Sequence, residues 1–240
     1  MDPIASLAAS GLRSKMEALD LLANNLANAG SVGYKADQEF RGTYVGLQDS
    51  GIAAQLPLIE RHWTQFANGM LQTTSNPLDF AIEGGGFFSV KGPSGTVYTR
   101  SGSFHLSAKG VLVNQEGLEV LDGNGRSIQL DPLLQVDVDR DGTIRQGGAI
   151  VSRISVVNFK DLSALTKQGH LYFQAPDGTS SPAAGATVLQ AKLEGSNVST
   201  ADSAVRLVSV LREFEALQKA IGVSTEMNRR VVEDVGRIGS

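Results

Sequence analysis

The spacing of apolar residues changes twice along the chain, and this change constrains the fold more than any other feature of the sequence. Apolar residues recur every three to four positions in residues 3–29 and again in residues 207–235, which is typical of amphipathic helices. In residues 68–190, turn residues recur roughly every 8–12 positions and separate short β-rich intervals. We therefore expect a helix at each end and an all-β sandwich or irregular barrel between them.

The first predicted helix carries a narrow apolar stripe. Leu12, Leu19 and Leu26 share one heptad position, and Leu22 lies on the partner position, with Lys15 as the interruption. A stripe confined to two heptad positions is typical of a coiled coil, whereas a helix on a globular core has a broader apolar face.

The second predicted helix repeats the pattern near the C-terminus. Ser199 is a suitable N-cap, and Asp202 follows it by three positions. The apolar residues at its two heptad positions are Leu207, Val210, Phe214, Leu217, Ile221, Val231 and Val235.

These patterns predict a discontinuous α+β fold, in which long N- and C-terminal helices pair as a coiled coil and enclose a central all-β domain. The expected domains are residues 1–35 and 199–240 for the paired helices, 36–67 for an extended connector and 68–198 for the β domain. Two paired helices bury little apolar surface, and isolated helices depend on tertiary packing for most of their stability. The apolar surface that the pair leaves uncovered then needs other copies of the chain to cover it. Contacts between copies that do not close into a ring generate filaments.

Composition excludes several functions. Lys and Arg number 21 against 25 Asp and Glu, without a basic stripe, which argues against nucleic-acid binding and membrane-surface attachment. The absence of Cys excludes disulfides, Cys-based metal sites and thiol nucleophiles. No run of about 18 apolar residues occurs, and the N-terminus lacks the features of a secretory signal. We therefore expect no membrane insertion, and any export to proceed without a cleaved leader.

The best candidate for a chemical site is the acidic segment with Asp137, Asp139 and Asp141. It matches the first eight positions of a calcium-binding EF-hand loop, but the twelfth position, which should be Glu, is Gly148. The interpretation we favour is a β-hairpin whose turn contains Asp141 and Gly142. The sequence has no phosphate-binding loop, metalloprotease or serine-hydrolase motif. We therefore expect no enzyme, cofactor or metal.

Three asparagines, Asn24, Asn25 and Asn28, cluster at the end of the first predicted helix. Asn favours helix ends, so a local role at the terminus is one interpretation. Their position beside the apolar stripe also allows hydrogen bonds to a neighbouring subunit, and the sequence leaves both open.

Four segments, in order along the chain, resemble the bacterial flagellar rod and hook family. Residues 22–35 read LANNLANAGSVGYK and are similar to the family's N-terminal signature. Residues 76–88 (NPLDFAIEGGGFF), 98–104 (YTRSGSF) and 193–198 (LEGSNV) resemble three further family motifs. The sequence departs from the common pattern at Gly30, Ser31 and Ser199.

The resemblance implies a structural subunit of the flagellar basal-body rod. Its length implies one of the two rod proteins that carry a single β domain. Such subunits leave the cell uncleaved through the flagellar type III export apparatus, and their terminal helices pack in an inner coiled-coil tube with the β domains outside. The implied partners are copies of itself and other rod and hook proteins, in a drive shaft that crosses the periplasm and transmits torque. The remoter alternative is a binding module or enzyme on the β domain, with the helices as an oligomerisation segment; it predicts a concave pocket with converging polar groups.

Together, pattern and resemblance predict an assembly interface on the two helices. Its residues are Leu12, Leu19, Leu22, Asn24, Asn25, Leu26, Asn28, Leu207, Val210, Phe214, Leu217, Ile221, Val231 and Val235.

Overall fold

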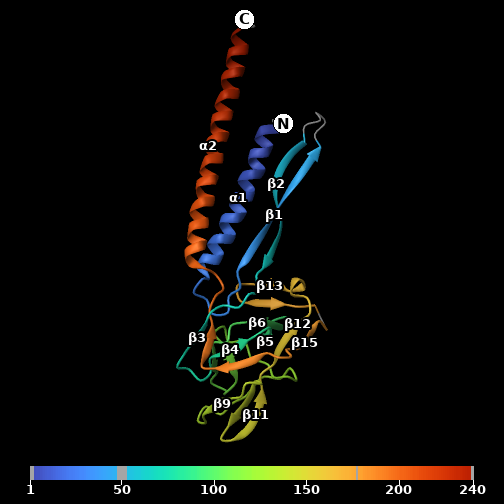
Figure 1. Cartoon of the computed structure of the whole chain (residues 1–240), viewed down its shortest axis with the longest axis vertical. Helices are drawn as coiled ribbons and strands as arrows, with labels where there is room; N and C mark the ends of the chain where they lie inside the picture. Colours follow the sequence, from blue (N-terminus) through green and yellow to red (C-terminus); the bar gives the residue numbers. More distant parts are fainter. Residues whose placement is uncertain (1–2, 48–52, 177, 239–240) are drawn as a thin grey trace. The chain divides into compact units, whose positions relative to one another are not determined.

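The computed structural model describes residues 3–47, 53–176 and 178–238 (Figure 1). Side chains of residues 3–8, 40–47, 53–61, 224, 228 and 231–238 lie outside this description. The chain divides into two compact units: unit 1 comprises Met1–Ala27, Asp37–Trp63 and Ser199–Ser240, and unit 2 comprises residues 28–36 and 64–198.

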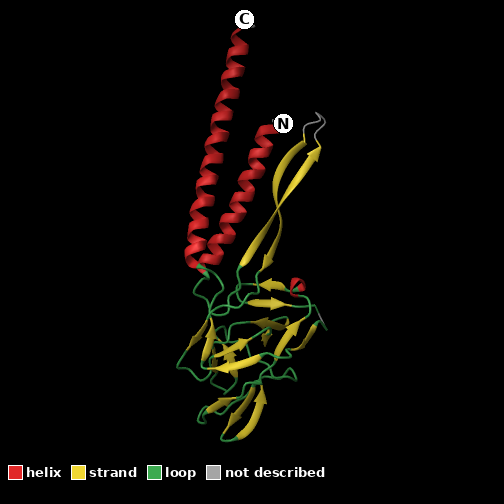
Figure 2. Ribbon diagram, in the orientation of Figure 1, coloured by secondary structure: helices red, strands yellow, loops and turns green. Residues whose placement is uncertain are grey.

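Unit 1 contains two helices and one strand pair (Figure 2). Helix α1 spans Pro3–Ala27 and helix α2 spans Thr200–Ile238. Helix α2 begins where the sequence predicts, because the hydroxyl of Ser199 accepts a hydrogen bond from the Asp202 N–H at 3.3 Å. Strands β1 (Asp37–Leu47) and β2 (Ala53–Thr64) pair as a two-stranded sheet within the segment that the sequence predicts as a connector.

The regular secondary structure of unit 2 consists almost entirely of short strands. They are β3 (Leu71–Thr73), β4 (Phe80–Glu83), β5 (Phe87–Gly92), β6 (Gly95–Thr99), β7 (Phe104–Leu106), β8 (Leu112–Asn114), β9 (Val136–Val138), β10 (Thr143–Gln146), β11 (Ala149–Arg153), β12 (Val156–Phe159), β13 (Thr166–Gln168), β14 (Tyr172–Gln174), β15 (Ser180–Pro182), β16 (Thr187–Gln190) and β17 (Lys192–Glu194), with a 3-10 turn at Leu162–Ala164. The largest sheet has the order β13-β14-β6-β5-β12-β15, and its neighbouring strands run antiparallel. Three further pairs, β16-β4, β17-β3 and β7-β8, and the triplet β11-β10-β9 complete the unit.

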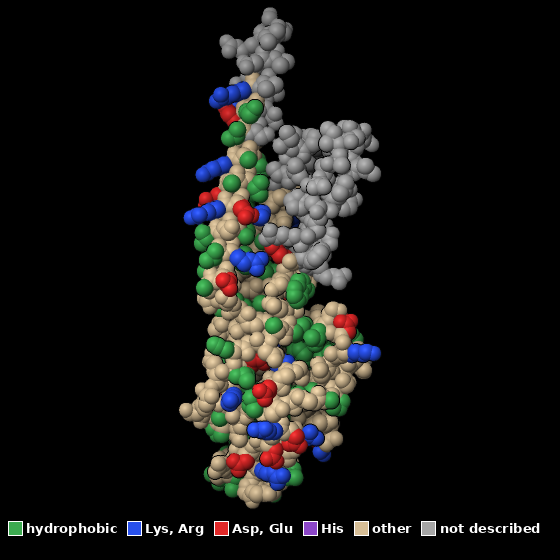
Figure 3. Space-filling model, in the orientation of Figure 1, with side chains coloured by type: hydrophobic (Ala, Val, Ile, Leu, Met, Phe, Trp, Pro, Cys, Tyr) green, Lys and Arg blue, Asp and Glu red, His purple; other side chains and the backbone are tan. Residues whose placement is uncertain are grey.

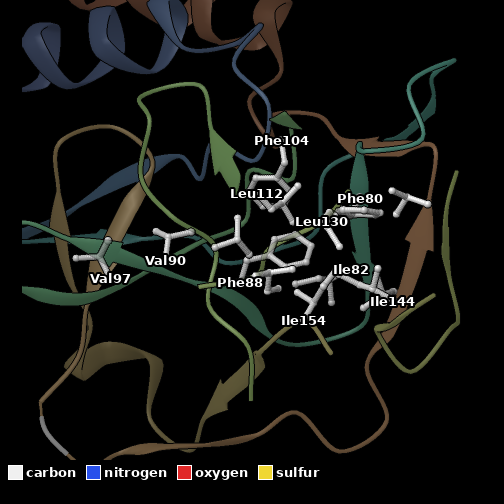
Figure 4. Close-up of a cluster of buried hydrophobic side chains, with 14 residues drawn as sticks. Phe80, Ile82, Phe88, Val90, Val97, Phe104, Leu112, Leu130, Ile144 and Ile154 are labelled. Carbon is white, nitrogen blue, oxygen red and sulfur yellow. The ribbon is translucent and has the colours of Figure 1, made fainter. Parts of the chain in front are cut away.

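Two apolar clusters hold unit 2 together, one on each side of β5. Alternate residues of a strand point to opposite faces, so Phe88 and Val90 enter the larger cluster whereas Phe87 enters the other. In the larger cluster, Phe88 packs edge-on against Phe104 with ring centroids 5.4 Å apart (Figure 4). In the smaller cluster, Phe87 packs with Phe173 at 5.6 Å. The short β-rich intervals between the turns of the sequence therefore form strands, and these strands pack around two cores.

The predicted fold class is wrong. The chain is β-rich, and its two described α-helices are unequal, at 25 and 39 residues. They lie side by side in Figure 1, but the described residues buried between them form one small cluster, Ala18, Leu22 and Val210, instead of a continuous coiled coil. The heptad pattern was misleading because the residues that α1 buries include small and polar ones, while most of α2 is exposed.

One predicted strand is also divided. The sequence indicates a continuous strand over residues 188–193, whereas the structure contains β16 and β17 separated by Ala191. The φ angle of Ala191 is +53°, which breaks the extended conformation. As a result β16 pairs with β4 and β17 pairs with β3.

Candidate assembly surface and buried junction

The predicted interface residues of α1 are only partly those that the helix buries. The buried positions are Gly11, Ala18, Leu22 and Asn25, which follow one another at helical spacing. Lys15 lies on the same face of the helix, and its ammonium pairs with Glu213 of α2. The predicted residues Leu12, Leu19 and Leu26 lie beside this buried face and are half-buried.

On α2 the predicted positions are the less exposed ones. Val210 is buried and Leu207 packs against the same cluster. Phe214, Leu217 and Ile221 are half-buried and continue the same face of the helix. The side chains of Val231 and Val235 lie outside the described residues.

A second face of α2 presents large apolar side chains to solvent (Figure 3). Val205 is 71% exposed and Val208 is 48% exposed, and Leu211, Val223 and Met227 are also exposed. We call Val205, Val208 and Leu211 the apolar flank of α2. Because soluble proteins leave few neighbouring large apolar side chains uncovered, this flank is a candidate interface.

The three asparagines differ in their surroundings. The Asn25 side chain is buried and bonds the Asp37 backbone in both directions, donating from Nδ2 to the carbonyl at 2.7 Å and accepting from the N–H at 3.0 Å. Asn28 accepts a hydrogen bond from the Ser31 hydroxyl in the turn after α1. Asn24 is exposed. Asn25 therefore fixes the start of β1.

A buried group of charges in unit 2 brings three of the family-like segments together. The Glu194 side chain is 1% exposed, and its Oε1 accepts from the Lys35 ammonium at 2.6 Å and from the Gly69 N–H at 2.9 Å. Its Oε2 accepts from Arg100 Nη1 at 3.2 Å. We call Lys35, Arg100 and Glu194 the charged junction.

Backbone groups complete the hydrogen bonding of the charged junction. Arg100 also donates to the carbonyls of Ile82 and Gly84, at 3.3 and 2.8 Å, and its guanidinium carbon lies 5.3 Å from the centre of the Phe87 ring. Lys35 also donates to the Ala67 carbonyl at 2.8 Å. Burial lowers the pKa of both cations, and the hydrogen bond and the charge of Glu194 oppose that shift. The Glu194 carboxylate therefore stabilises the charged form of both side chains.

Neighbouring residues tie the two ends of unit 2 to each other. The Gly33 N–H donates to the Glu194 carbonyl at 2.7 Å. Asn197 accepts from the Ala36 N–H at 2.8 Å and donates to the carbonyls of Gln65 and Ala67. Residues 33–36 and 194–197 thus form one hydrogen-bonded layer.

The charged junction was not among the predicted site residues. A signal was available, because each cation and the carboxylate lie within a quoted family-like segment: Lys35 in GYK, Arg100 in YTR and Glu194 in LEG. Lys35 and Arg100 lie 159 and 94 positions from Glu194, and the sequence does not indicate that they contact it. The ion pairs were therefore not predicted.

The acidic segment forms the predicted hairpin. Strands β9 and β10 pair antiparallel, and Gly142 has a φ of +85° in the turn. Asp139 pairs with Arg145 at 2.8 Å, and Asp141 pairs with Arg153 at 3.7 Å. Hydrogen bonds from the N–H and then the hydroxyl of Thr143 lower the pKa of Asp141. Asp137 is exposed, and no three acidic or His side chains of the described chain gather as a metal site.

Unit 2 has a shallow hollow lined in part by Lys109, Gln129, Asp131 and Gln146. The Gln146 amide is already engaged, because it accepts from the Asp131 N–H and donates to the carbonyls of Asp131 and Leu134. The Gln146 side chain is therefore not free to bind a ligand in this hollow. Neither helix, within its described residues, is both long and apolar enough to cross a bilayer.

Comparison with known proteins identifies the relatives of this chain. The family model described as "Flagellar hook protein FlgE/F/G D1 domain" matches residues 81–146, and "Flagellar basal body rod FlgEFG protein C-terminal" matches residues 189–233. The flagellar basal-body rod protein FlgF of Caulobacter vibrioides is 34% identical over 229 residues, which cover 92% of each chain. FlgF of Mesorhizobium japonicum is 34% identical over 82% of this chain and 83% of its own length. FlgG of Bacillus subtilis is 30% identical over 93% of this chain and 95% of its own length. This chain therefore belongs to the family of flagellar basal-body rod proteins.

Proposed function

We propose that the chain is a structural subunit of the flagellar basal-body rod, of the FlgF type, which acts in the proximal rod and assembles through its terminal helices. Family membership supports the rod assignment, and the relatives named FlgF support the type. The alternative is the distal rod protein FlgG, to which the chain is also similar.

The observation that carries the assembly proposal is the apolar flank of α2. Val205, Val208 and Leu211 are exposed on a helix of which Val210 is the one buried residue among those described. Burying a fully exposed Val or Leu side chain contributes about 1.5–3 kcal/mol, and covering these partly exposed side chains would contribute a part of that. A second copy or another rod protein would supply that cover, and contacts of this heterologous kind extend without closing.

The charged junction supports a mechanical role for unit 2. A shaft that transmits torque needs subunits that do not deform, and Glu194 binds Lys35 near one end of the unit to Arg100 in its middle. Buried charge pairs resist separation because each partner is costly to leave alone in a low-dielectric interior. Load that enters through residues 28–36 would thus reach the β-sheets of unit 2 without passing through a flexible linker.

Location and partners follow from this role. We propose that the subunit is exported without cleavage through the flagellar type III apparatus, and that it contacts copies of itself and other rod and hook proteins in the periplasm. We expect no catalytic activity, since the relatives are named as rod proteins.

Val208→Asp tests the assembly proposal. Val208 is 48% exposed, so a carboxylate there should leave the isolated subunit folded. In an assembled interface, the same carboxylate would be buried without a partner, at a cost of about 3–5 kcal/mol. We expect cells that carry only this variant to lose swimming and to yield no intact basal bodies in electron micrographs.

Ser209→Asp is the matched control, because Ser209 is an exposed polar residue at the next position of α2. This variant should retain motility. Normal rods with Val208→Asp would show that the apolar flank is not an interface.

A further inference from the structure

Glu194 joins parts of unit 2 that are far apart in the sequence. It lies 159 residues from Lys35 and 94 residues from Arg100. It is also the last residue of β17, the final strand of the unit. The anion of the charged junction is therefore the last of its three members along the chain.

The Arg100 guanidinium is buried in the folded unit, and the carboxylate that pairs with it comes 94 residues later in the chain. Arg100 follows β6, and its side chain is 4% exposed between the carbonyls of Ile82 and Gly84 and the ring of Phe87. Its Nε has no hydrogen-bond partner among the residues that the structure describes. The two carbonyls carry only partial charge, so they do not neutralise the cation in a buried site.

Lys35 is in the same situation at the other end of the unit. Its side chain is fully buried, and besides Glu194 its ammonium has the Ala67 carbonyl as a partner. Without Glu194, both cations would be buried with no carboxylate of the described residues in contact with either of them. A buried ion that loses its partner is strongly destabilising, by a factor of about 100 or more in the folding equilibrium.

We propose that docking of residues 192–197 is the committing step in the folding of unit 2, and that the strands before it are unstable until Glu194 reaches Lys35 and Arg100. The inference does not depend on the rod assignment. Since synthesis proceeds from the N-terminus, it means that unit 2 stays unfolded until nearly its whole sequence has been made.

Pulse-labelling hydrogen exchange during refolding of the full chain tests the order of events. We expect amides of β4 to β6 to become protected with the same rate constant as amides of residues 192–197. Protection of β4 to β6 at least tenfold faster than that of residues 192–197 would overturn the proposal, because the strands would then be stable without the carboxylate.

Equilibrium unfolding of full-chain variants tests the role of charge. Glu194→Gln keeps the size and the hydrogen-bond acceptor but removes the anion, and we expect it to lower the folding equilibrium constant of unit 2 about 100-fold. Lys35→Met should cost less than Glu194→Gln, since it leaves Arg100 and Glu194 as a balanced pair. When Glu194→Gln is already present, adding Lys35→Met should lower the folding equilibrium constant less than Lys35→Met does in the native chain. In the Glu194→Gln background, Lys35 is an unpaired buried cation, and its removal relieves that cost.

Asp139→Asn is the matched control, since it removes the carboxylate of an exposed ion pair in the same unit. It should change the equilibrium constant less than about fivefold. Equal effects of Glu194→Gln and Asp139→Asn, or strict additivity of the Lys35 and Glu194 substitutions, would overturn the proposal.

Discussion

At the scale of single residues, unit 2 depends on places where only a hydrogen atom fits. A Cβ built on Gly102 would lie 1.7 Å from the Phe80 carbonyl oxygen, and one on Gly69 would lie 1.9 Å from the Gly195 oxygen. At Gly33, φ is +71° and a Cβ would lie 2.3 Å from the Ser101 nitrogen. In each case the obstacle is backbone, which cannot move aside as a flexible side chain can.

Gly102→Ala is therefore expected to destabilise unit 2 by about 3 kcal/mol, at the upper end of the usual cost of overpacking. The substitution should lower the urea midpoint of unit 2 in the full chain, measured by circular dichroism of its β-signal. Gly30→Ala is the control, since both glycines lack a positive φ and a Cβ on Gly30 meets nothing within 4 Å. A urea midpoint as high for Gly102→Ala as for Gly30→Ala would show that the backbones of Gly102 and Phe80 are not so close.

Residue-level prediction succeeded where the determinants are local. The hairpin at Asp141-Gly142 followed from a turn dipeptide between two short β-rich intervals, and the structure confirms it. The charged junction was not predicted, because its residues meet only in the folded chain, where Lys35 Nζ lies 2.6 Å from Glu194 Oε1. Sequence patterns report burial and turns over short spans, whereas a buried ion pair is a property of the tertiary structure.

At the scale of secondary-structure elements, the two helices were predicted with unequal success. Both exist close to their expected bounds, and the Ser199 cap begins α2 as predicted. The pairing as a coiled coil was wrong, because α1 buries Gly11 and Ala18, which a search for large apolar residues passes over. Small residues allow helices to approach closely, so they can lie at a contact without contributing to an apolar pattern.

The exposed middle of α2 allows its intrinsic stability to be tested. Gly222 is exposed, and nothing lies within 4 Å of the position of an added Cβ. Since Gly is about 1 kcal/mol less favourable than Ala inside a helix, Gly222→Ala should stabilise α2 by about that amount. We expect higher helicity by circular dichroism and slower hydrogen exchange near residue 222.

Ala220→Gly, at an exposed position two residues earlier, should change helicity and exchange in the opposite direction. If neither substitution altered the exchange of α2 in the isolated subunit, the stability of this helix would not be set by its own propensity.

At the scale of the whole molecule, the chain contains two units with separate cores of different size. In unit 1 the described buried apolar residues between the helices are Ala18, Leu22 and Val210. Unit 2 has a core of fourteen buried apolar residues and a second, aromatic one. Because stability scales with the apolar area removed from water, the helices of unit 1 should be the weaker part in an isolated subunit.

Thermal unfolding of the isolated subunit should consequently occur in two steps, with loss of helix signal before loss of β-signal. Val210→Ala removes two buried methyl groups from unit 1 and should lower only the first transition, by about 2 kcal/mol. Phe88→Ala empties the centre of the larger core and should lower only the second, by about 4 kcal/mol. Calorimetry at low protein concentration, where copies do not associate, separates the two steps. A single transition that both substitutions shift together would mean that the units unfold as one, and the weakness of the helices could then not be the reason for the assembly proposed for them.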